Sequence, residues 1–374
     1  MSLFYPMQTF GRFGLSYGLT PSLLHRRYGL DYGERFHRDI AWRVAQVMEI
    51  DRQVRRDFGD IGLGFSDPFP RASIEPYGHR FVPALYGCAT AYAASEDPSG
   101  VRKAFDAEEI RALAPWTRER LESSEPVRVV LEQARWARAN CDRAAAERRL
   151  GFTPHSQPLT SLQNLGSVIN TAVSVFGEDA LLLGMDEPDL LRAFYRNVAD
   201  LMLLCLEYFP AVDGRKLHTV FVGNCTVAMI SPAHYATCNL EPDGRLAGFA
   251  RRIGARFLVH QDSGATPHLE NYARLGSVQG IDFGQDTDWE EAARVFPNVE
   301  ATCIVFPGWI RAHSRQEIQE ELERLMTAGV RFPRFTFSIL ELDAELAAGK
   351  VFEFHEAFRK AAEAVSRDAP AGGG

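Results

Sequence analysis

The second half of the chain alternates short apolar runs with longer amphipathic stretches. The short runs are rich in β-branched and aromatic residues, as buried strands are, and the stretches between them carry apolar residues at helical spacing. This pattern predicts strands at 150–154, 218–222, 256–260, 278–283, 300–306 and 334–340. It predicts helices at 161–176, 188–208, 232–253, 267–275, 289–295, 314–328 and 343–365.

The first 150 residues follow a different pattern. The first 60 read as mostly helical, with the clearest helix at 36–56, where Ile40, Val44 and Val47 recur on one face. Further helices are predicted at 106–113 and 126–148. Two weaker strand candidates lie at 60–67 and 80–85.

Repeated strand and helix units predict parallel strands joined by crossovers, either in an open doubly wound sheet or in a closed barrel. No GxGxxG motif follows any strand, which weakens the nucleotide-binding open sheet. The strand count approaches eight. We therefore expect an α/β fold, a (β/α)8 TIM-type barrel over 59–366, preceded by an N-terminal helical extension over 1–58 and followed by a disordered tail at 367–374.

Composition narrows the class of protein. The 374 residues are 46% hydrophobic and 24% charged, which is ordinary for a globular protein, and the formal charge of −8 argues against a nucleic-acid surface. Six scattered cysteines without a CxxC pair fit a reducing compartment. The first residues lack a basic, apolar leader, and no apolar run approaches the roughly 20 residues that span a bilayer. We expect a cytoplasmic protein with no membrane partner.

The sharpest chemical signal is the stretch from His260 to Gly264, which ends an apolar run. Residues two apart in a strand point the same way, so His260 and Asp262 should share one space at the carboxyl end of the strand. Cys225 follows the preceding strand. Zinc accepts imidazole, carboxylate and thiolate, so these three residues are the predicted metal ligands. The alternative is that His260 only hydrogen-bonds Asp262 or the backbone, while Cys225 is a small buried residue.

Other polar residues at predicted strand ends complete the candidate site, because barrels place their chemistry there. The catalytic candidates are His260 and Asp262 together with Asp282 and Glu341, either of which would be a second carboxylate near the open metal position. The substrate-binding candidates are Asp67, His155, Gln157, Asn224 and Trp309.

Several segments together resemble a known family. They are Ser73–Gly78, Gly184–Leu191, Met229–Tyr235, Glu241-Pro242, His260–Gly264 and Gly280–Asp282. Their order and spacing are similar to the uroporphyrinogen decarboxylase superfamily, over roughly residues 28 to 362. That superfamily includes the decarboxylase itself and the corrinoid and thiol methyltransferases. The resemblance implies a (β/α)8 barrel with its cleft at the carboxyl face.

The methyltransferase branch carries a His-x-Cys motif and a later cysteine, which hold zinc. His260 matches the histidine, Asp262 stands in place of the first cysteine, and Ser338 stands about where the second is expected. Oxygen ligands make zinc a weaker activator of a substrate thiol. They remain compatible with a zinc that acts as a Lewis acid on an ether oxygen or an amine.

The decarboxylase branch has an arginine-rich N-terminal segment that grips substrate carboxylates. Here the N-terminus offers only Gly11–Gly14 and His25–Arg27. Chemistry of this branch needs no metal, and His260 with Asp262 would then be an acid/base pair.

Three hypotheses follow. The first is metal-dependent methyl transfer between a small substrate and a corrinoid or thiol acceptor, with zinc or another divalent metal as cofactor and a corrinoid as co-substrate. The second is a metal-independent decarboxylase acting on a tetrapyrrole or another carboxylated ring. The third is a non-catalytic protein that binds a corrinoid or tetrapyrrole. The expected partners are a small molecule, a corrinoid protein or a second copy in a homodimer, but no nucleic acid.

Overall fold

One curved, mostly parallel sheet organises the protein. The computed structural model describes residues 3–103, 107–150, 165–214 and 216–368. Eight strands form this sheet, and a separate two-stranded pair is made by β4 (Thr90–Ala91) and β5 (Ser99–Gly100). The strands of the main sheet are β1 (Leu3–Phe4), β2 (Gln8–Phe10), β3 (Phe13–Leu19), β6 (Thr219–Gly223), β7 (Arg256–Gln261), β8 (Val278–Gly284), β9 (Glu300–Ile304) and β10 (Phe335–Leu342).

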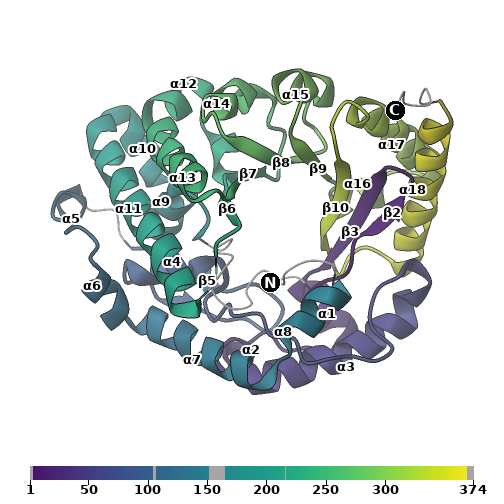
Figure 1. Cartoon of the computed structure of the whole chain (residues 1–374), viewed down its shortest axis with the longest axis horizontal. Helices are drawn as coiled ribbons and strands as arrows, with labels where there is room; N and C mark the ends of the chain where they lie inside the picture. Colours follow the sequence, from purple (N-terminus) through teal and green to yellow (C-terminus); the bar gives the residue numbers. More distant parts are fainter. Residues whose placement is uncertain (1–2, 104–106, 151–164, 215, 369–374) are drawn as a thin grey trace.

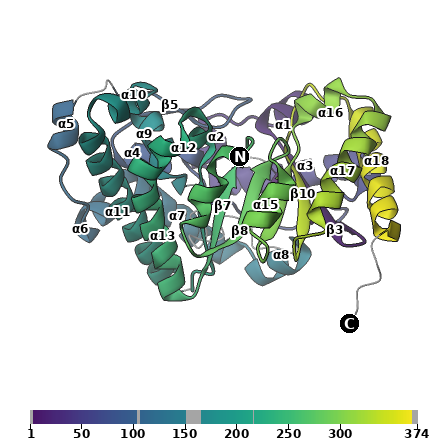
Figure 2. The same cartoon turned by 90° about the horizontal axis from the view of Figure 1, so that it is seen from above.

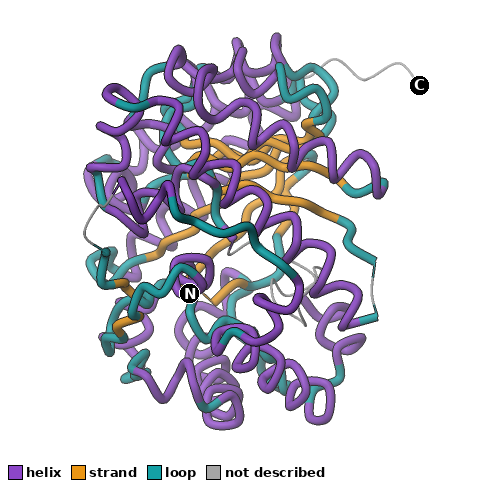
Figure 3. Tube along the Cα trace, turned by 90° about the vertical axis from the view of Figure 1, so that its left-hand side faces the viewer, coloured by secondary structure: helices purple, strands orange, loops and turns teal. Residues whose placement is uncertain are grey.

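The strand order is β1-β3-β10-β9-β8-β7-β6, with β2 also paired to β3. From β6 to β10 each strand pairs in parallel with the next along the chain, and β10 then pairs in parallel with β3. Of the strands in the described residues, β1 and β2 run antiparallel to β3. These strands lie along an arc in Figure 1 and are enclosed by helices in Figure 3.

Helices cover the outer face of this arc, and further helices and loops make up the rest of the described residues. In the first half they are α1 (Pro21–Tyr28), α2 (Glu34–Arg38), α3 (Ile40–Phe58), α4 (Phe81–Leu85), α5 (Ala107–Arg111), α6 (Arg118–Ser123), α7 (Glu125–Asn140), α8 (Arg143–Leu150), α9 (Val168–Phe176) and α10 (Asp179–Asp186). In the second half they are α11 (Pro188–Asp213), α12 (Pro232–His234), α13 (Leu240–Ile253), α14 (Leu269–Ala273), α15 (Trp289–Val295), α16 (Pro307–Ala312), α17 (Arg315–Gly329) and α18 (Ala348–Asp368). Figure 2 shows α9, α11 and α13 at one end of the molecule and α16, α17 and α18 at the other.

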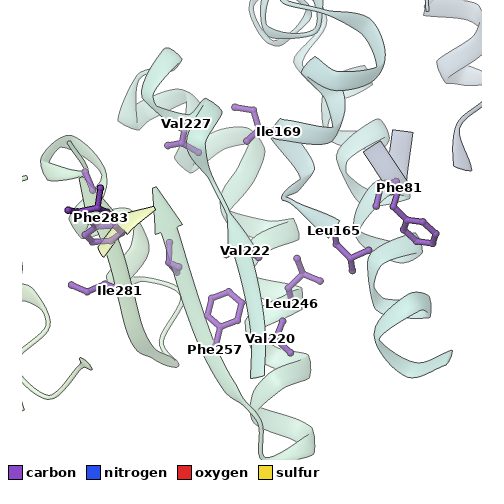
Figure 4. Packing of buried hydrophobic residues seen from close by; sticks show 14 of the residues in the cluster. Phe81, Leu165, Ile169, Val220, Val222, Val227, Leu246, Phe257, Ile281 and Phe283 are labelled. Carbon is purple, nitrogen blue, oxygen red and sulfur yellow. The ribbon is translucent and has the colours of Figure 1, made fainter. Parts of the chain in front are cut away.

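Alternation along the strands separates the two faces of the sheet. Val220, Val222, Phe257, Ile281 and Phe283 are buried against the helices, as the close view in Figure 4 shows for this part of the core. The residues between them face the inner, concave side and stay partly accessible. The sheet therefore buries its outer face in the apolar core, and its inner face carries both apolar side chains, such as Phe221 and Leu258, and polar ones, such as His260 and Asp282.

The prediction of a closed (β/α)8 barrel is wrong. Among the described residues the sheet stops at β6 on one side and at β1 and β2 on the other, so it is an open, curled half-barrel. Two predicted strands are not strands. Residues 60–67 contain a 3-10 helix, Gly59–Ile61, and then turn through Gly62 and Gly64, whose φ angles of 72° and 74° are left-handed. Residues 80–85 form the end of a 3-10 helix, Gly78–Arg80, and α4.

The predicted N-terminal helical extension is wrong as well, because the first residues supply strands to the same sheet. In β3, Phe13, Leu15, Tyr17 and Leu19 alternate with smaller residues, and their side chains are buried. This strand pairs with β10 in register, for example Leu15 with Phe337. The apolar residues of β3 alternate in the sequence, but Gly14 and Gly18 lie between them, and glycine is uncommon in strands.

The remaining elements agree well with the predictions. The strands β6 to β10 lie where they were expected, and α15 matches its predicted bounds of 289–295. The predicted helix 126–148 is broken at Cys141 into α7 and α8, and 232–253 is broken by a π-helical turn, Tyr235–Asn239. The predicted strand 150–154 and the start of the helix at 161 lie almost wholly outside the described residues, as does most of the predicted tail.

In the described part of the chain no single helix has the length and apolar character needed to cross a membrane. Two consecutive helices, Val168–Phe176 and Asp179–Asp186, are together long and apolar enough for a membrane span, but the chain bends by 112° between them.

Candidate metal centre

The candidate site lies where β6, β7 and β8 end side by side. Parallel pairing places Gly223 opposite His260 and His260 opposite Asp282. Because both side chains point to the concave face, the imidazole and the carboxylate are neighbours. Cys225 opens the 3-10 helix Cys225–Met229 directly after β6, and Asp262 follows the last residue of β7.

Cys225, His260 and Asp262 converge into a group that could hold a metal ion. One ligand atom from each, sulfur, imidazole nitrogen and carboxylate oxygen, lies within 4.8 Å of the other two, and all three residues are half-buried. In tetrahedral zinc, with bonds of about 2.0 to 2.3 Å, ligand atoms lie roughly 3.5 Å apart. The donors therefore suit a borderline cation such as zinc, and only a small closure would be needed to bind one.

Asp282 orients the histidine. The Nδ1 of His260 donates a hydrogen bond to Oδ2 of Asp282 at 2.8 Å, which leaves Nε2 as the ring nitrogen available to a metal. Burial alone would lower the pKa of His260, but Asp282 and Cys225 outweigh it and raise the pKa well above its usual value. The ring of Phe221 lies 5.5 Å from the imidazole, centroid to centroid.

The loop that carries Asp262 is fixed against β8. The backbone N–H of Gly284 donates to the carbonyl of Ser263 at 3.1 Å, and that of Ala265 donates to the hydroxyl of Thr287 at 3.1 Å. A Cβ added at Gly284 would lie 2.6 Å from the carbonyl oxygen of Asp262, so only glycine permits this approach. The site rests on tightly packed backbone.

Two further titratable residues interact with this group. The pKa of Glu341 is raised, mainly by burial and next by the charge of Asp262, although the residue remains exposed. The pKa of His79 is lowered, mainly because surrounding protein desolvates its ring, and His260 lowers it further. His79 comes from the first half of the chain and was not predicted. A lone histidine near a helix carries no sequence signal of this kind.

Asp282 was predicted as a carboxylate near an open metal position, and that role stays a prediction. The structure adds a contact that was not predicted, because Asp282 accepts a hydrogen bond from Nδ1 of His260. The same geometry places Cys225, His260 and Asp282 in the order of a nucleophile, a base and an orienting acid. The presence of Asp262 in the group favours a metal, because a thiol–imidazole pair has no need of it.

The other predicted contacts lie at varied places. Asp67 is 92% exposed on its side chain and pairs with Arg149 at 3.6 Å. Asn224 is buried and bonded to Asp243. Trp309 lies in α16, after the carboxyl end of β9, and stacks on His313 with centroids 4.7 Å apart. His155 and Gln157 lie outside the described residues.

Hydroxyl groups continue the concave face beyond Asp282. Thr302 lies opposite Asp282 in the next strand and shares a hydrogen bond of 2.9 Å with Thr336. One level further along, Ser338 and Ser16 are joined at 2.9 Å. Ser338 stands where the resemblance predicts a cysteine ligand. Its hydroxyl is engaged in the hydrogen bond with Ser16 of β3.

Asp243 was missed by sequence reasoning. It lies on α13 in line with Leu246, Ala247 and Ala250, which are all buried. A carboxylate at an apolar position of an amphipathic helix is the signal that could have revealed it.

Comparison with known proteins places the fold but not the activity. No family model matches the chain, and no curated protein matches it. The structure is similar to that of a methyltransferase from Methanosarcina mazei, with a TM-score of 0.59 and 11% sequence identity; the similarity covers 93% of this chain and 91% of that one. At this identity the similarity shows a shared fold over nearly the whole length of both chains.

Proposed function

We propose that this protein is a metal-dependent methyltransferase that passes a one-carbon unit from a small substrate to a corrinoid or thiol acceptor. The observation that carries the proposal is the convergence of Cys225, His260 and Asp262, with Asp282 behind the histidine. The methyltransferase with the similar fold supports the reaction class. Membership of the uroporphyrinogen decarboxylase superfamily stays a prediction from the sequence.

The three residues would hold zinc or another divalent cation, with one position left open. When bound, such a cation would act as a Lewis acid on the donor heteroatom or on an acceptor thiol. Asp282 holds the His260 ring so that Nε2 faces the ligand group. A carboxylate that accepts a hydrogen bond from the second ring nitrogen commonly orients a metal-binding histidine, and Asp282 would have this role here.

In the reaction, the acceptor's lone pair attacks the methyl carbon, and the bond from carbon to the donor heteroatom breaks with its electron pair going to the heteroatom. We assign Glu341 to protonating that leaving heteroatom, because it lies near the carboxyl end of β10, and the ligand group also lies at the carboxyl ends of its strands. Its raised pKa agrees with a proton-donating role. A Glu341→Gln variant should lose turnover while it keeps bound metal.

Metal content tests the proposal directly. Elemental analysis of the purified protein should find about one zinc or other divalent ion per chain. His260→Ala should weaken binding by more than about 100-fold, and Asp282→Asn by about 10- to 100-fold. His218→Ala is the matched control. His218 is exposed and lies just before the amino end of β6, whereas the ligand group lies at the carboxyl ends of the strands. This variant should keep full metal content.

Activity should follow the metal. A panel of methylated ethers, amines and thioethers, offered with a thiol or a reduced corrinoid, should yield methylated acceptor with wild-type protein and none with His260→Ala. Full methyl transfer by metal-free protein would disprove the proposal. Chelator-insensitive release of carbon dioxide from uroporphyrinogen would support the decarboxylase hypothesis instead. Binding of a corrinoid or tetrapyrrole without turnover, followed by visible absorbance, would support the non-catalytic one.

A further inference from the structure

A buried polar cluster lies directly behind the ligand group and contributes no ligand to it. Its centre is Asp243, which is 0% exposed. The Oδ2 atom of Asp243 accepts hydrogen bonds from the hydroxyl of Tyr235 at 2.6 Å and from Nδ2 of Asn224 at 3.0 Å. Both donors are neutral, so the carboxyl group has hydrogen-bond partners but no counter-charge.

This carboxyl group is expensive to bury. No lysine or arginine in the described part of the chain pairs with Asp243, and burial is the main cause that raises its pKa to about 6. Its second oxygen is buried without a hydrogen-bond partner among the described residues. An isolated buried carboxylate destabilises a fold unless its position serves another purpose.

The contacts of the cluster indicate that purpose. Asn224 immediately precedes Cys225, and its backbone N–H donates to the carbonyl of His260 at 2.7 Å. Its side chain is held by Asp243, which belongs to α13. Asn224 therefore ties together three elements: the end of β6, the end of β7 and the helix between them.

A second branch fixes the residue between the other two ligands. The hydroxyl of Tyr272 donates to Oε1 of Gln261 at 2.7 Å, and Nε2 of Gln261 donates to the carbonyl of Gly264 at 3.0 Å. Tyr272 also packs edge to face on Tyr235, with ring centroids 5.5 Å apart. The two branches hold β7 between them through buried side chains that are not themselves part of the ligand group.

We propose that Asp243 is a positioning residue for the candidate metal centre: through Asn224 it fixes Cys225 relative to His260 and Asp262. The inference rests on the proposed function, since it concerns the same metal centre. It goes beyond that function by assigning a role to a residue that contacts neither the metal position nor the substrate.

Cobalt binding tests this role, because a cobalt-bound thiolate gives a near-ultraviolet charge-transfer band that reports Cys225 specifically. Asp243→Leu removes the acceptor of both donors. It should weaken Co²⁺ binding by about 10- to 100-fold and reduce the thiolate band per bound ion. Asp243→Asn keeps an acceptor oxygen and should retain the wild-type band. Asn224→Ala should reproduce the loss, and it replaces Asp243→Leu if that variant fails to fold.

Asp51→Ala is the matched control. It also removes a buried carboxylate that accepts from a tyrosine, but far along the chain from the site, and it should lower stability while leaving the cobalt spectrum unchanged. A folded Asp243→Leu or Asn224→Ala variant with wild-type affinity and a full thiolate band would overturn the inference. Failure of the wild-type protein to bind Co²⁺ or Zn²⁺ would instead overturn the proposed function, so the two failures are distinguishable.

Discussion

Asp51 and Asp243 are both fully buried aspartates that accept a hydrogen bond from a buried tyrosine. Of the two, Asp51 lies beside a cation, and Asp243 has none among the residues that the structure describes. Arg71 reaches its Oδ1 at 2.7 Å, and Tyr5 donates to the same oxygen at 3.0 Å. Within the described ranges, the hydrogen-bond partners of the Asp243 carboxyl group are Tyr235 and Asn224. Arg71 offsets part of the free-energy cost of burying the Asp51 carboxylate. No cation offsets that cost for Asp243 among the described residues, and Asp243 lies beside the candidate site.

The two aspartates show that the fold accepts a buried carboxyl group without a counter-charge at one place and supplies a counter-charge at the other. The ion pair of Asp51 and Arg71 joins α3 to the loop that follows it. Both aspartates bury one carboxyl oxygen without a hydrogen-bond partner among the described residues, so the counter-charge alone separates them. The carboxyl group without a counter-charge is the one that lies next to the residues that would bind a metal.

The largest expected effect comes from removing the cation at Asp51. Arg71→Met should leave that carboxylate charged, buried and unpaired, and it should lower the free energy of unfolding by about 3–5 kcal/mol. Urea denaturation followed by circular dichroism would measure the loss. A loss below about 1 kcal/mol would mean that Arg71 does not compensate Asp51, and the contrast with Asp243 would disappear.

The pH dependence of stability should separate the two aspartates next. Burial raises the pKa of Asp243 from 3.8 to about 6 in the folded state. The stability that this group contributes is therefore present below pH 3.8 and lost as the pH rises to about 6, by about 3 kcal/mol.

The measurement is urea unfolding of the wild type and of Asp243→Asn from pH 3.5 to 7. The stability difference between them should shift over that window in favour of the variant as the pH rises. Burial also raises the pKa of Asp51, but Arg71 opposes the rise, so Asp51→Asn should show a smaller pH dependence. Equal slopes for the two variants would contradict the comparison.

The smallest effect concerns the tyrosines. Tyr235→Phe removes one of two donors to an uncompensated carboxylate and should cost about 1.5–3 kcal/mol, the usual range for a hydrogen bond to a charged group. Tyr5→Phe should cost less, because Arg71 still contacts the same oxygen of Asp51. Paired denaturation curves at pH 7 would show the order, and a larger loss for Tyr5→Phe would reverse our interpretation.

The sequence predicted the parallel strands β6 to β10 and the meeting of Cys225 with His260 and Asp262, because strand ends and period-two alternation are local properties. It did not predict the pairing of His260 with Asp282. An irregularity after Phe257 skips Gln279, so His260 lies opposite Asp282 and not Ile281. The side chain of Gln279 accepts from the backbone N–H of Phe257 at this point. A one-residue shift of this kind depends on both strands at once.

The open sheet was unpredictable for a related reason. Strand counting treated 60–67 as a strand because its apolar residues alternate, yet Gly64 approaches so closely that an added Cβ would lie 2.2 Å from the backbone nitrogen of Arg55. Such packing against α3 is not encoded in a local pattern. The strand β3 was missed for a different reason. It is stabilised by pairing with β10, which lies at the other end of the chain, so no local pattern reveals the partner.

The pairing of β3 with β10 has a consequence for biosynthesis. Ser16 and Ser338 touch across it although 322 residues separate them. At translation rates of about 5–20 residues per second, β3 leaves the ribosome about 16 to 64 seconds before its partner exists. During that interval the strand exposes an unpaired edge of alternating aromatic and aliphatic residues, a template for wrong pairing. This edge of β3 gains its native partner when the last strand, β10, has emerged.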